Sequence, residues 1–331
     1  MNSPVTGKTM ELLKEKRTIE FRKEPFEQIF HYYRCTDSGM ELEDERLLDL
    51  NLDQVYNAYR SKHKLPFAED IKQIRIQYDL PATTMSEILG FGVNQYRLYE
   101  TGDIPSETNA RLIQMAADPN EFLRLIELSG AVDGKVKEKL LTRIAALKEK
   151  ITAWNTVRER MLGIHLPNEY NGYRKTSPEK AYHQVRFFAD NLHPTKTALN
   201  KFLFYSDFYH YKQFGMGISG LQYRAIQWGP VPSQFDYLFN MAEENGVINL
   251  KYEVWNGDKE MVIIDPAPGT PFKKELFTDE EIKSMEAVAK TLKKLKTNQL
   301  VDISHNELAW KENIEGKKLI SYQYAFELMA L

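Results

Sequence analysis

The spacing of hydrophobic and polar residues changes several times along this chain of 331 residues. Within residues 1–50, the runs RTIEFRKE and QIFHYYRC are rich in aromatic and β-branched residues and predict short strands, broken at EKR and EPFE. Residues 51–63 carry Leu52, Val55 and Tyr59 at spacings of three and four. This spacing predicts an amphipathic helix after the strands.

The pattern from Pro66 to Asp118 predicts a series of short helices. The apolar residues that share successive helix faces are Ile71, Ile74 and Tyr78, then Met85, Ile88 and Leu89, then Tyr96 and Tyr99, then Ile113 and Met115. Asp118-Pro119 ends the series, because the residue before a proline disfavours the helical conformation.

Residues 131–162 predict one long helix. Its apolar positions are Val136, Leu140, Ile144, Leu147, Ile151, Trp154 and Met161. This spacing fits two arrangements: a coiled coil between two copies of the chain, which would make a homodimer, and a helix that packs on its own domain. The repeat is too short to decide between them.

The segment HLPNEYNGYRKTSPEK is rich in Pro, Asn, Gly and Ser and predicts a linker before a second globular part. In that part we expect helices at ALNKFLFYSDFYHYKQFG and DYLFNMAEENG. Strands at NLKYEVW and KEMVIIDP are expected to pair through a turn at Asn256-Gly257. Thr278 and Glu281 have the spacing of a helix capping box.

These elements predict an α+β fold that is mainly helical. The chain length favours more than one domain. The four consecutive parts that we expect are a small β ribbon at 1–50, a helix-turn-helix at 51–118, a long connecting helix at 119–165 and a mostly helical domain with a small β-hairpin at 166–331.

Composition narrows the expected location and partners. No apolar run approaches the ~18–20 residues needed to cross a bilayer, and the first residues lack the apolar core of a signal peptide. One cysteine cannot form an internal disulfide. We therefore expect a cytoplasmic protein that does not bind membranes. The net charge is −3, so the chain has no global basic field that attracts nucleic acid.

The segment IKQIRIQYDLPATTMSEILGFGVNQYRLYETGDIP contains a short helix, a turn at Gly90 and a second helix, in the order of a DNA-binding helix-turn-helix. Gly90 suits a left-handed backbone between the two helices. The pairs Leu89-Gly90 and Tyr99-Glu100, followed by Gly102 and Pro105-Ser106, resemble the Xre/Cro-type helix-turn-helix over most of residues 66–118. The alternative is a helical bundle that binds no DNA.

The expected DNA contacts follow from position in this motif. Asn94 and Gln95 begin the second helix and would reach base edges, and Arg97 would contact guanine or phosphate. The residues expected to contact phosphate are Lys72, Arg75 and Ser86. Residues 66–118 contain twice as many acidic as basic side chains. This excess predicts weak and strongly salt-dependent binding.

The N-terminal segment resembles the zinc ribbon of MqsA-type antitoxins, which precedes a helix-turn-helix. The two C-x-x-C-G knuckles of that ribbon fall on SPVTG at residues 3–7 and CTDSG at residues 35–39. Only Cys35 keeps a thiol, and hydroxyl groups bind zinc poorly, so we expect no structural metal and no cofactor. A rebuilt site from Cys35 and His31 is the alternative.

The resemblance to MqsA-type antitoxins continues into the helix-turn-helix, where GFGVNQYRLYETG is close to the family pattern. Asn94 matches the asparagine that reads a base in that family. The family's second base-reading residue, an arginine, is replaced by Leu98, although Arg97 is adjacent. This difference leaves the operator sequence open.

The stretch from Thr195 to Ile248 resembles the Panacea domain of SocA-like antitoxins. The residues that carry the resemblance are KFLFY at 201–205, Asp207, GISG at 217–220, Tyr223 and WGPVP at 228–232. The resemblance implies a domain that neutralises a toxin by direct contact. The residues that we expect at the partner surface are Tyr205, Asp207, Tyr223, Trp228 and Pro230. The alternative is that most of the aromatic residues here form the core.

No catalytic motif accompanies these features: the chain has no Gly-rich phosphate loop and no G-x-S-x-G, H-E-x-x-H or C-x-x-C sequence. We therefore do not expect an enzyme. The expected function is that of a type II antitoxin, with a cognate protein toxin and promoter DNA as partners. The alternatives are a transcription regulator that senses a ligand or partner, and an interaction protein that acts as an adaptor to a protease.

Overall fold

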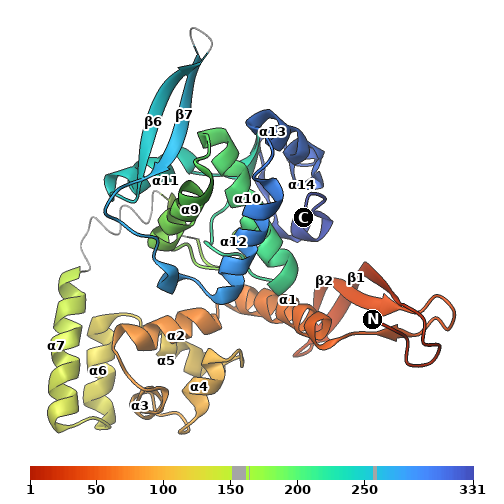
Figure 1. The fold of residues 1–331 in the computed structure, drawn as a ribbon. Coiled ribbons are helices and arrows are strands. Elements are labelled where there is room, and N and C mark those ends of the chain that lie inside the picture. Colours follow the sequence, from red (N-terminus) through yellow and green to blue (C-terminus); the bar gives the residue numbers. More distant parts are fainter. Residues whose placement is uncertain (151–161, 164, 256–258) are drawn as a thin grey trace. The chain divides into compact units, whose positions relative to one another are not determined.

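The computed structural model describes residues 1–150, 162–163, 165–255 and 259–331. Internal contacts divide the chain into two units. The first combines Met1–Ala58 with Glu159–Leu331, and the second is Tyr59–Arg158. Helices predominate and the small sheets are antiparallel (Figure 1), so the predicted fold class, α+β and mainly α, is confirmed.

The first unit begins with an antiparallel ribbon. Its strands are β1 (Glu11–Phe21), β2 (Glu24–Arg34) and β3 (Glu41–Leu42). The predicted breaks at EKR and EPFE are wrong, because β1 and β2 pair along their full length. Most side chains of β1 are exposed, so polar residues are tolerated within it. α1 (Glu45–His63) begins earlier than predicted, and the Asp44 carboxylate accepts the N–H of Leu47 in its first turn.

The second unit is a group of helices around one core. Its helices are α2 (Ala68–Gln77), α3 (Ala82–Ile88), α4 (Gln95–Glu100), α5 (Glu107–Met115), α6 (Pro119–Ser129) and α7 (Gly134–Lys150). The apolar residues that share the predicted helix faces meet in this core, among them Ile71, Met85 and Tyr96. Asp118-Pro119 also begins α6, because the Asp118 carboxylate accepts the N–H of Asn120.

The long helix predicted over 131–162 is described as α7, up to Lys150. The predicted positions that lie outside the described residues are Ile151, Trp154 and Met161. Leu140 and Ile144 are buried in the core of the second unit, whereas Val136 is exposed. At Leu140 and Ile144, α7 therefore packs on its own unit, as one of the two predicted arrangements requires.

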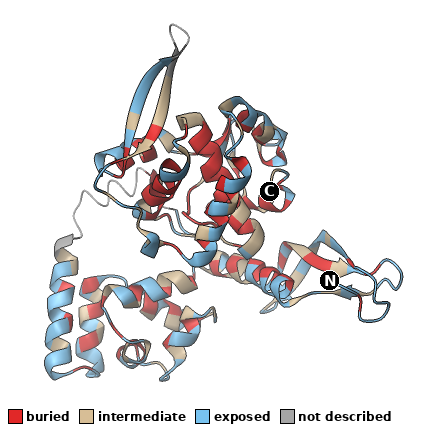
Figure 2. Ribbon diagram, viewed as in Figure 1, coloured by how far each residue is buried: buried red, intermediate tan, exposed pale blue. Residues whose placement is uncertain are grey.

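The C-terminal part of the first unit surrounds one central helix, α10 (Lys196–Phe214), whose residues 198–208 are all buried (Figure 2). A helix that is buried on every side needs apolar residues around its whole circumference, which explains the aromatic run in this segment. The other helical elements of this part are α9 (Pro178–Leu192), α11 (Phe235–Glu244), α12 (Asp279–Leu292), α13 (Thr297–Asn306), α14 (Leu308–Lys311) and the 3-10 segments η1 (Lys274–Leu276) and η2 (Tyr322–Glu327).

Two small sheets accompany these helices. The strands of the first are β5 (Gly229–Pro232), β4 (Tyr223–Ile226) and β8 (Leu319–Ile320), in that spatial order. β6 (Ile248–Trp255) and β7 (Lys259–Pro266) form the predicted hairpin, which extends beyond α9 and α11 (Figure 1). The predicted turn at Asn256-Gly257 lies outside the described residues.

Two further observations bear on the sequence predictions. The capping box predicted at the start of α12 is confirmed, since Thr278 and Glu281 exchange side-chain and backbone hydrogen bonds. Among the described helices, none combines the length and the apolar character that a bilayer span needs.

Candidate functional site

The residues that we expect to contact DNA lie on α2, α3 and α4, with Asn94 at the N-cap of α4. After α3, Gly90 adopts φ +71°, a left-handed conformation that glycine tolerates without strain. The Ser86 hydroxyl accepts the backbone N–H of Tyr96 at 3.0 Å. The Tyr96 hydroxyl donates to the carbonyl oxygen of Ile71 at 2.7 Å. These two buried bonds connect α4 to α3 and to α2.

Two of the six expected DNA contacts have structural partners instead. Ser86 is completely buried, and its hydroxyl is used by Tyr96. Arg75 donates from Nε to Glu100 Oε1 at 2.6 Å and from Nη1 to the Leu80 carbonyl at 2.8 Å. The hydrogen-bonded Glu100 carboxylate raises the pKa of Arg75. Neither side chain is free for a phosphate, which corrects that part of the expectation.

The other four residues reach the surface to different degrees. Asn94 is exposed at the N-cap of α4, and its side chain makes no capping bond there. Arg97 and Lys72 are exposed, whereas Gln95 is half-buried. Leu98, which stands where the related family has a base-reading arginine, is 45% exposed. Asn94, Arg97 and Lys72 are therefore the accessible residues of the expected set.

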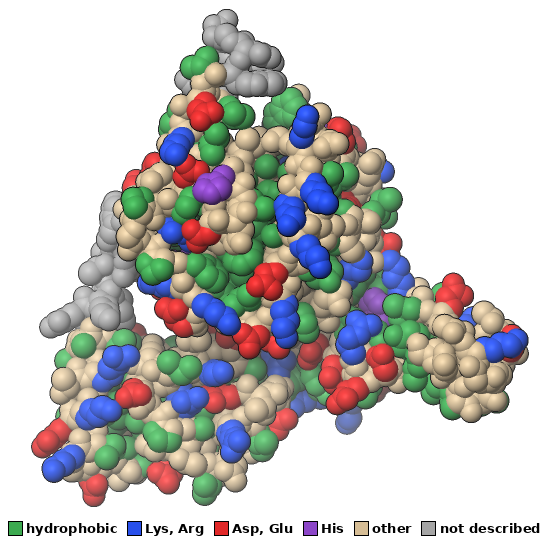
Figure 3. All heavy atoms as spheres, viewed as in Figure 1, with side chains coloured by type: hydrophobic (Ala, Val, Ile, Leu, Met, Phe, Trp, Pro, Cys, Tyr) green, Lys and Arg blue, Asp and Glu red, His purple; other side chains and the backbone are tan. Residues whose placement is uncertain are grey.

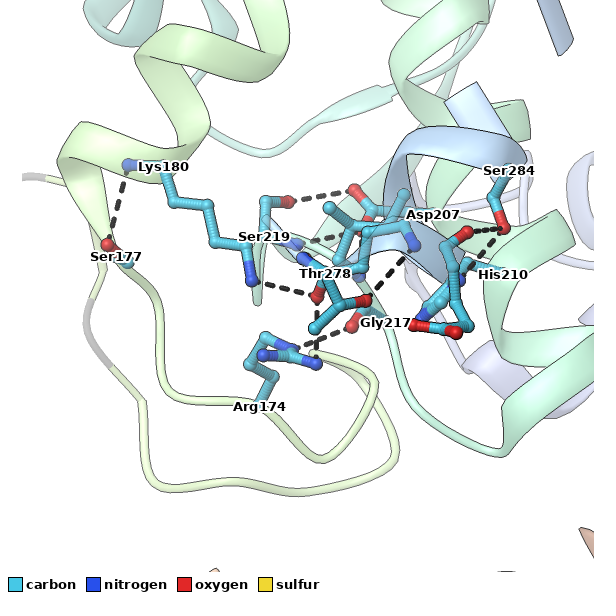
Figure 4. A network of polar contacts seen from close by, with 12 residues as sticks. Arg174, Ser177, Lys180, Asp207, His210, Gly217, Ser219, Thr278 and Ser284 are labelled. Atoms are coloured by element: carbon cyan, nitrogen blue, oxygen red, sulfur yellow. Dashed lines mark hydrogen bonds and ion pairs between the residues drawn. The ribbon is translucent and has the colours of Figure 1, made fainter. Parts of the chain in front are cut away.

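A buried polar network in the first unit is centred on Asp207 of α10 (Figure 4). Its Oδ1 accepts the backbone N–H groups of Ile218 at 2.7 Å and Ser219 at 3.1 Å. Its Oδ2 accepts the hydroxyls of Ser219 at 2.8 Å and Tyr223 at 2.6 Å. Burial raises the pKa of Asp207, while these four bonds act in the opposite direction. Asp207 therefore fixes the loop after α10 to the helix.

The same region contains a buried ion-pair cluster around Glu281, whose partners Lys180 and Arg174 are labelled in Figure 4. Glu281 Oε1 lies 2.8 Å from Lys180 Nζ and 3.0 Å from Arg174 Nη2. Arg174 Nε also donates to the Gly217 carbonyl at 2.7 Å. Burial lowers the pKa of Lys180 to about 8. Because the Glu281 side chain is inaccessible, the cluster joins α9 and α12 rather than facing a ligand.

Most of the side chains expected at a partner surface lie in the core. Tyr205 and Tyr223 are completely buried and Pro230 is buried. The Tyr205 hydroxyl donates to Glu307 Oε1 at 3.2 Å. These three residues and Asp207 thus have structural positions, which corrects the expected set. Trp228 differs: it lies in the turn between β4 and β5 and is 60% exposed.

The turn that carries Trp228 rests on a buried lysine. Lys201 of α10 is completely buried, and its Nζ donates to the Pro230 carbonyl at 3.0 Å. A Cβ atom on Gly229, which has φ +97°, would lie 2.6 Å from Lys201 Nζ and 2.4 Å from Ser304 Oγ. Burial lowers the pKa of Lys201 to about 7. The turn is therefore fixed by close packing beneath it.

The role of Lys201 was not predicted from the sequence, where it appeared only as part of a family motif. The available indication was a lysine among the apolar residues of KFLFY, with no polar face on that helix. A lysine in such a position must be buried or reach past its neighbours. No local pattern indicates that the partner of this lysine is the carbonyl of Pro230, 29 positions later.

The turns at residues 3–7 and 35–39 correspond to the two zinc knuckles. They form although only Cys35 supplies a thiol. The N–H of Gly7 donates to the Ser3 carbonyl at 2.9 Å, and that of Gly39 donates to the Cys35 carbonyl at 2.8 Å. Thr6 Oγ1 lies 3.3 Å from Cys35 Sγ. Hydrogen bonds from Ser38 and Thr6 lower the pKa of the Cys35 thiol to about 6.

These donors do not fit a structural zinc ion, which needs four thiolate, imidazole or carboxylate ligands. The alternative ligand His31 instead packs on Phe326, with ring centroids 4.7 Å apart. Within the described part of the chain, no three His, Cys, Asp or Glu side chains are grouped to hold a metal ion. The absence of zinc from the native protein stays a prediction.

Comparison with known proteins bears on the C-terminal part of the chain. Residues 199–311, from within α10 to the end of α14, match the family model described as antitoxin SocA-like, Panacea domain. The match confirms the resemblance expected there. It supports an antitoxin role in general, with a toxin as partner, and suggests a non-catalytic protein. No curated protein and no solved structure matches the chain.

Proposed function

We propose that this protein is the antitoxin of a type II toxin–antitoxin system in the cytoplasm. The domain expected at 166–331 binds a cognate protein toxin and neutralises it by direct contact. The helix-turn-helix expected at 51–118 binds promoter DNA and represses the operon. The observation that carries the proposal is the match of residues 199–311 to an antitoxin domain.

Of the five residues expected at the partner surface, Trp228 is the best candidate for a toxin contact. An exposed tryptophan offers a large apolar surface, and tryptophan is over-represented among residues that dominate binding energy. The turn beneath it is held by Lys201 and is tightly packed at Gly229. A fixed side chain loses little conformational entropy on binding, so this arrangement supports a contact role for Trp228.

The proposed DNA contact depends on Asn94 and Arg97 of the α4 region and on Lys72 of α2, which are exposed. Acidic and basic side chains are interspersed on the face that Figure 3 shows. Residues 66–118 contain twice as many acidic as basic side chains, so this segment offers few phosphate contacts, and autorepression would be weak and salt-dependent. A homodimer would double the number of phosphate contacts, and we include a homodimer in the proposal.

The direct test is co-expression of the full chain with the toxic product of a neighbouring gene. We expect the full chain to restore growth and to co-purify with that product. Trp228→Ala should weaken the complex by about 2 kcal/mol or more, the range of interface residues that dominate binding. Tyr252→Ala is the matched control, since Tyr252 is an exposed aromatic residue of the β6–β7 hairpin.

Failure of the full chain to protect cells from any neighbouring product would refute the antitoxin proposal. If the full chain protects but Trp228→Ala binds as tightly as wild type, the antitoxin role stands and Trp228 is excluded as a contact. If Tyr252→Ala alone weakens the complex, the contact lies on the hairpin instead.

A further inference from the structure

A surface groove in the first unit is lined by the ribbon, α1, the end of α10 and the last residues of the chain. Its volume is about 610 Å³, within the range of small-molecule sites, roughly 300–1,000 Å³. Its apolar lining residues are Leu12, Leu13, Leu47, Leu50, Phe326 and Leu328. Neither the proposed toxin contact at Trp228 nor the proposed DNA contacts involve a residue that lines this groove.

Hydrogen bonds fix the walls of the groove. The Asn51 side chain of α1 accepts the backbone N–H of His31 and donates to the His31 carbonyl, both at 2.9 Å. Asn57 of the same helix donates to the carbonyl of Gly215, the C-cap of α10, at 3.1 Å. A groove whose walls are held in this way is formed before a ligand arrives, which lowers the entropic cost of binding.

The charged side chains of the lining are mainly basic: Lys14, Arg46 and Lys212 face a single carboxylate, Glu327. Lys14 lies 2.8 Å from Glu327. Lys212 donates to the backbone carbonyls of Leu328 at 3.2 Å and Leu331 at 2.7 Å. Burial and the charge of Lys14 lower the pKa of Lys212, while the carboxylates of Glu307 and Glu327 act in the opposite direction. The groove therefore has an excess of positive charge.

His31 adds a polar group to the lining. Its side chain is 8% exposed, and its Nδ1 has no hydrogen-bond partner among the described residues. A buried polar atom without a partner is costly and is rare in folded proteins. Burial lowers the pKa of His31 to about 4, so the ring is neutral at physiological pH and can donate or accept one hydrogen bond.

We propose that this groove binds an apolar carboxylate. The hydrocarbon part lies against the leucines and Phe326, and the carboxylate lies near Arg46 and Lys212. A phosphate ester or nucleotide fits less well, because the exposed Leu12 and the half-buried Leu13 would then remain uncovered. Binding at this groove requires neither the toxin nor DNA, so it goes beyond the proposed function.

The first experiment measures binding of decanoate to the full chain by calorimetry, below the micelle concentration. We expect one saturable site per chain and binding of decan-1-ol at least about fivefold weaker, since the alcohol lacks the charge. In the NMR spectrum, the His31 ring resonances should shift on addition of decanoate. No saturable binding at millimolar decanoate, or equal binding of the alcohol, would overturn the proposal.

Three exposed positions test the orientation of the ligand. Arg46→Gln should weaken decanoate binding about fivefold, and Leu12→Asp should weaken it more, because a new carboxylate repels the ligand. Glu327→Gln should tighten binding. Lys23→Gln in the β1–β2 turn removes the same charge as Arg46→Gln but outside the groove, and should leave affinity unchanged. Equal effects of Arg46→Gln and Lys23→Gln would contradict a site at the groove.

A peptide arm distinguishes two sources of the carboxylate. A short peptide that ends in two leucines is compared with the same peptide carrying a C-terminal amide. Tighter binding of the free acid than of decanoate would indicate a polypeptide C-terminus as the natural ligand, whereas the reverse order would indicate a free acyl carboxylate. Equal affinity of the acid and amide peptides would show that the peptide carboxylate is not recognised and would exclude a polypeptide C-terminus as the ligand.

Discussion

At the scale of single residues, burial decides what a carboxylate does in this protein. Asp207 is completely buried and accepts four hydrogen bonds from the loop after α10. Asp236 is exposed and forms an ion pair with Lys196 at the surface. The sequence marks both simply as aspartates in helical surroundings. Only the folded chain distinguishes the structural residue from the solvated one.

Replacement of Asp207 by Asn should destabilise the protein by about 2–4 kcal/mol, because an amide cannot accept all four donors and leaves buried groups unpaired. Urea unfolding followed by circular dichroism measures this loss. Asp236→Asn is the control and should cost about 1 kcal/mol or less. Equal costs for the two variants would show that the Asp207 network contributes little to stability.

Lys201 should make stability depend on pH. Its pKa is about 7 in the folded chain and near 10.5 in the unfolded chain. Between these values the unfolded state binds the extra proton, so raising the pH stabilises the fold, by up to about 1.4 kcal/mol per pH unit. Below pH 7 both states are protonated and this contribution no longer changes.

The measurement compares wild type with Lys201→Met, which lacks the titrating group but keeps much of the side-chain volume. Urea unfolding at pH 7, 8 and 9 should show wild type gaining stability relative to the variant, by roughly 2 kcal/mol in total. Parallel profiles for the two proteins would mean that Lys201 keeps its proton in the fold, and the interpretation of its burial would be wrong.

At the scale of elements, the turns were predicted better than the limits of the strands and helices. Gly90 was assigned a left-handed turn from its neighbours alone, and it has φ +71°. The β6–β7 hairpin and the α12 capping box also follow from local patterns. The uninterrupted β1 was missed because exposed ribbons lack the alternation of a half-buried strand.

Gly229 provides a test at this scale, since its conformation and its packing can be separated. Gly229→Ala should cost roughly 2–5 kcal/mol, because a Cβ meets Lys201 and Ser304 in addition to the backbone strain. Gly269 has φ +90° but nothing within 4 Å of a Cβ, so Gly269→Ala should cost only about 1–2 kcal/mol. Thermal unfolding measures the stability of the two variants. Equal losses of stability would show that close packing at Gly229 adds nothing to the backbone strain.

At the scale of the whole molecule, segments far apart in the sequence form one unit. Residues 1–58 group with the C-terminal part, and Asn57 bonds to Gly215 across 158 positions. Local patterns contain no information about such pairings. The four consecutive domains expected from the sequence stay a prediction.

Binding of the full chain to its own promoter tests the DNA part of the proposal. Asn94→Ala and Arg97→Ala should each weaken the complex by roughly 1–3 kcal/mol if they read bases, as measured by gel shift at low salt. Arg111→Ala on α5 removes an exposed charge elsewhere in the same unit and is the matched control. If Asn94→Ala and Arg97→Ala bind the promoter DNA as tightly as wild type, α4 does not lie in the groove of the DNA.

The sequence by itself determined the fold class, the helical nature of residues 66–118, the β6–β7 hairpin and the likeness of the C-terminal part to an antitoxin domain. These features depend on the spacing of neighbouring residues and on local motifs. The tertiary structure decided which polar residues are accessible: Ser86, Arg75, Asp207 and Tyr205 are held by partners, whereas Trp228 is exposed. Accessibility depends on contacts between distant segments, and no local pattern specifies them.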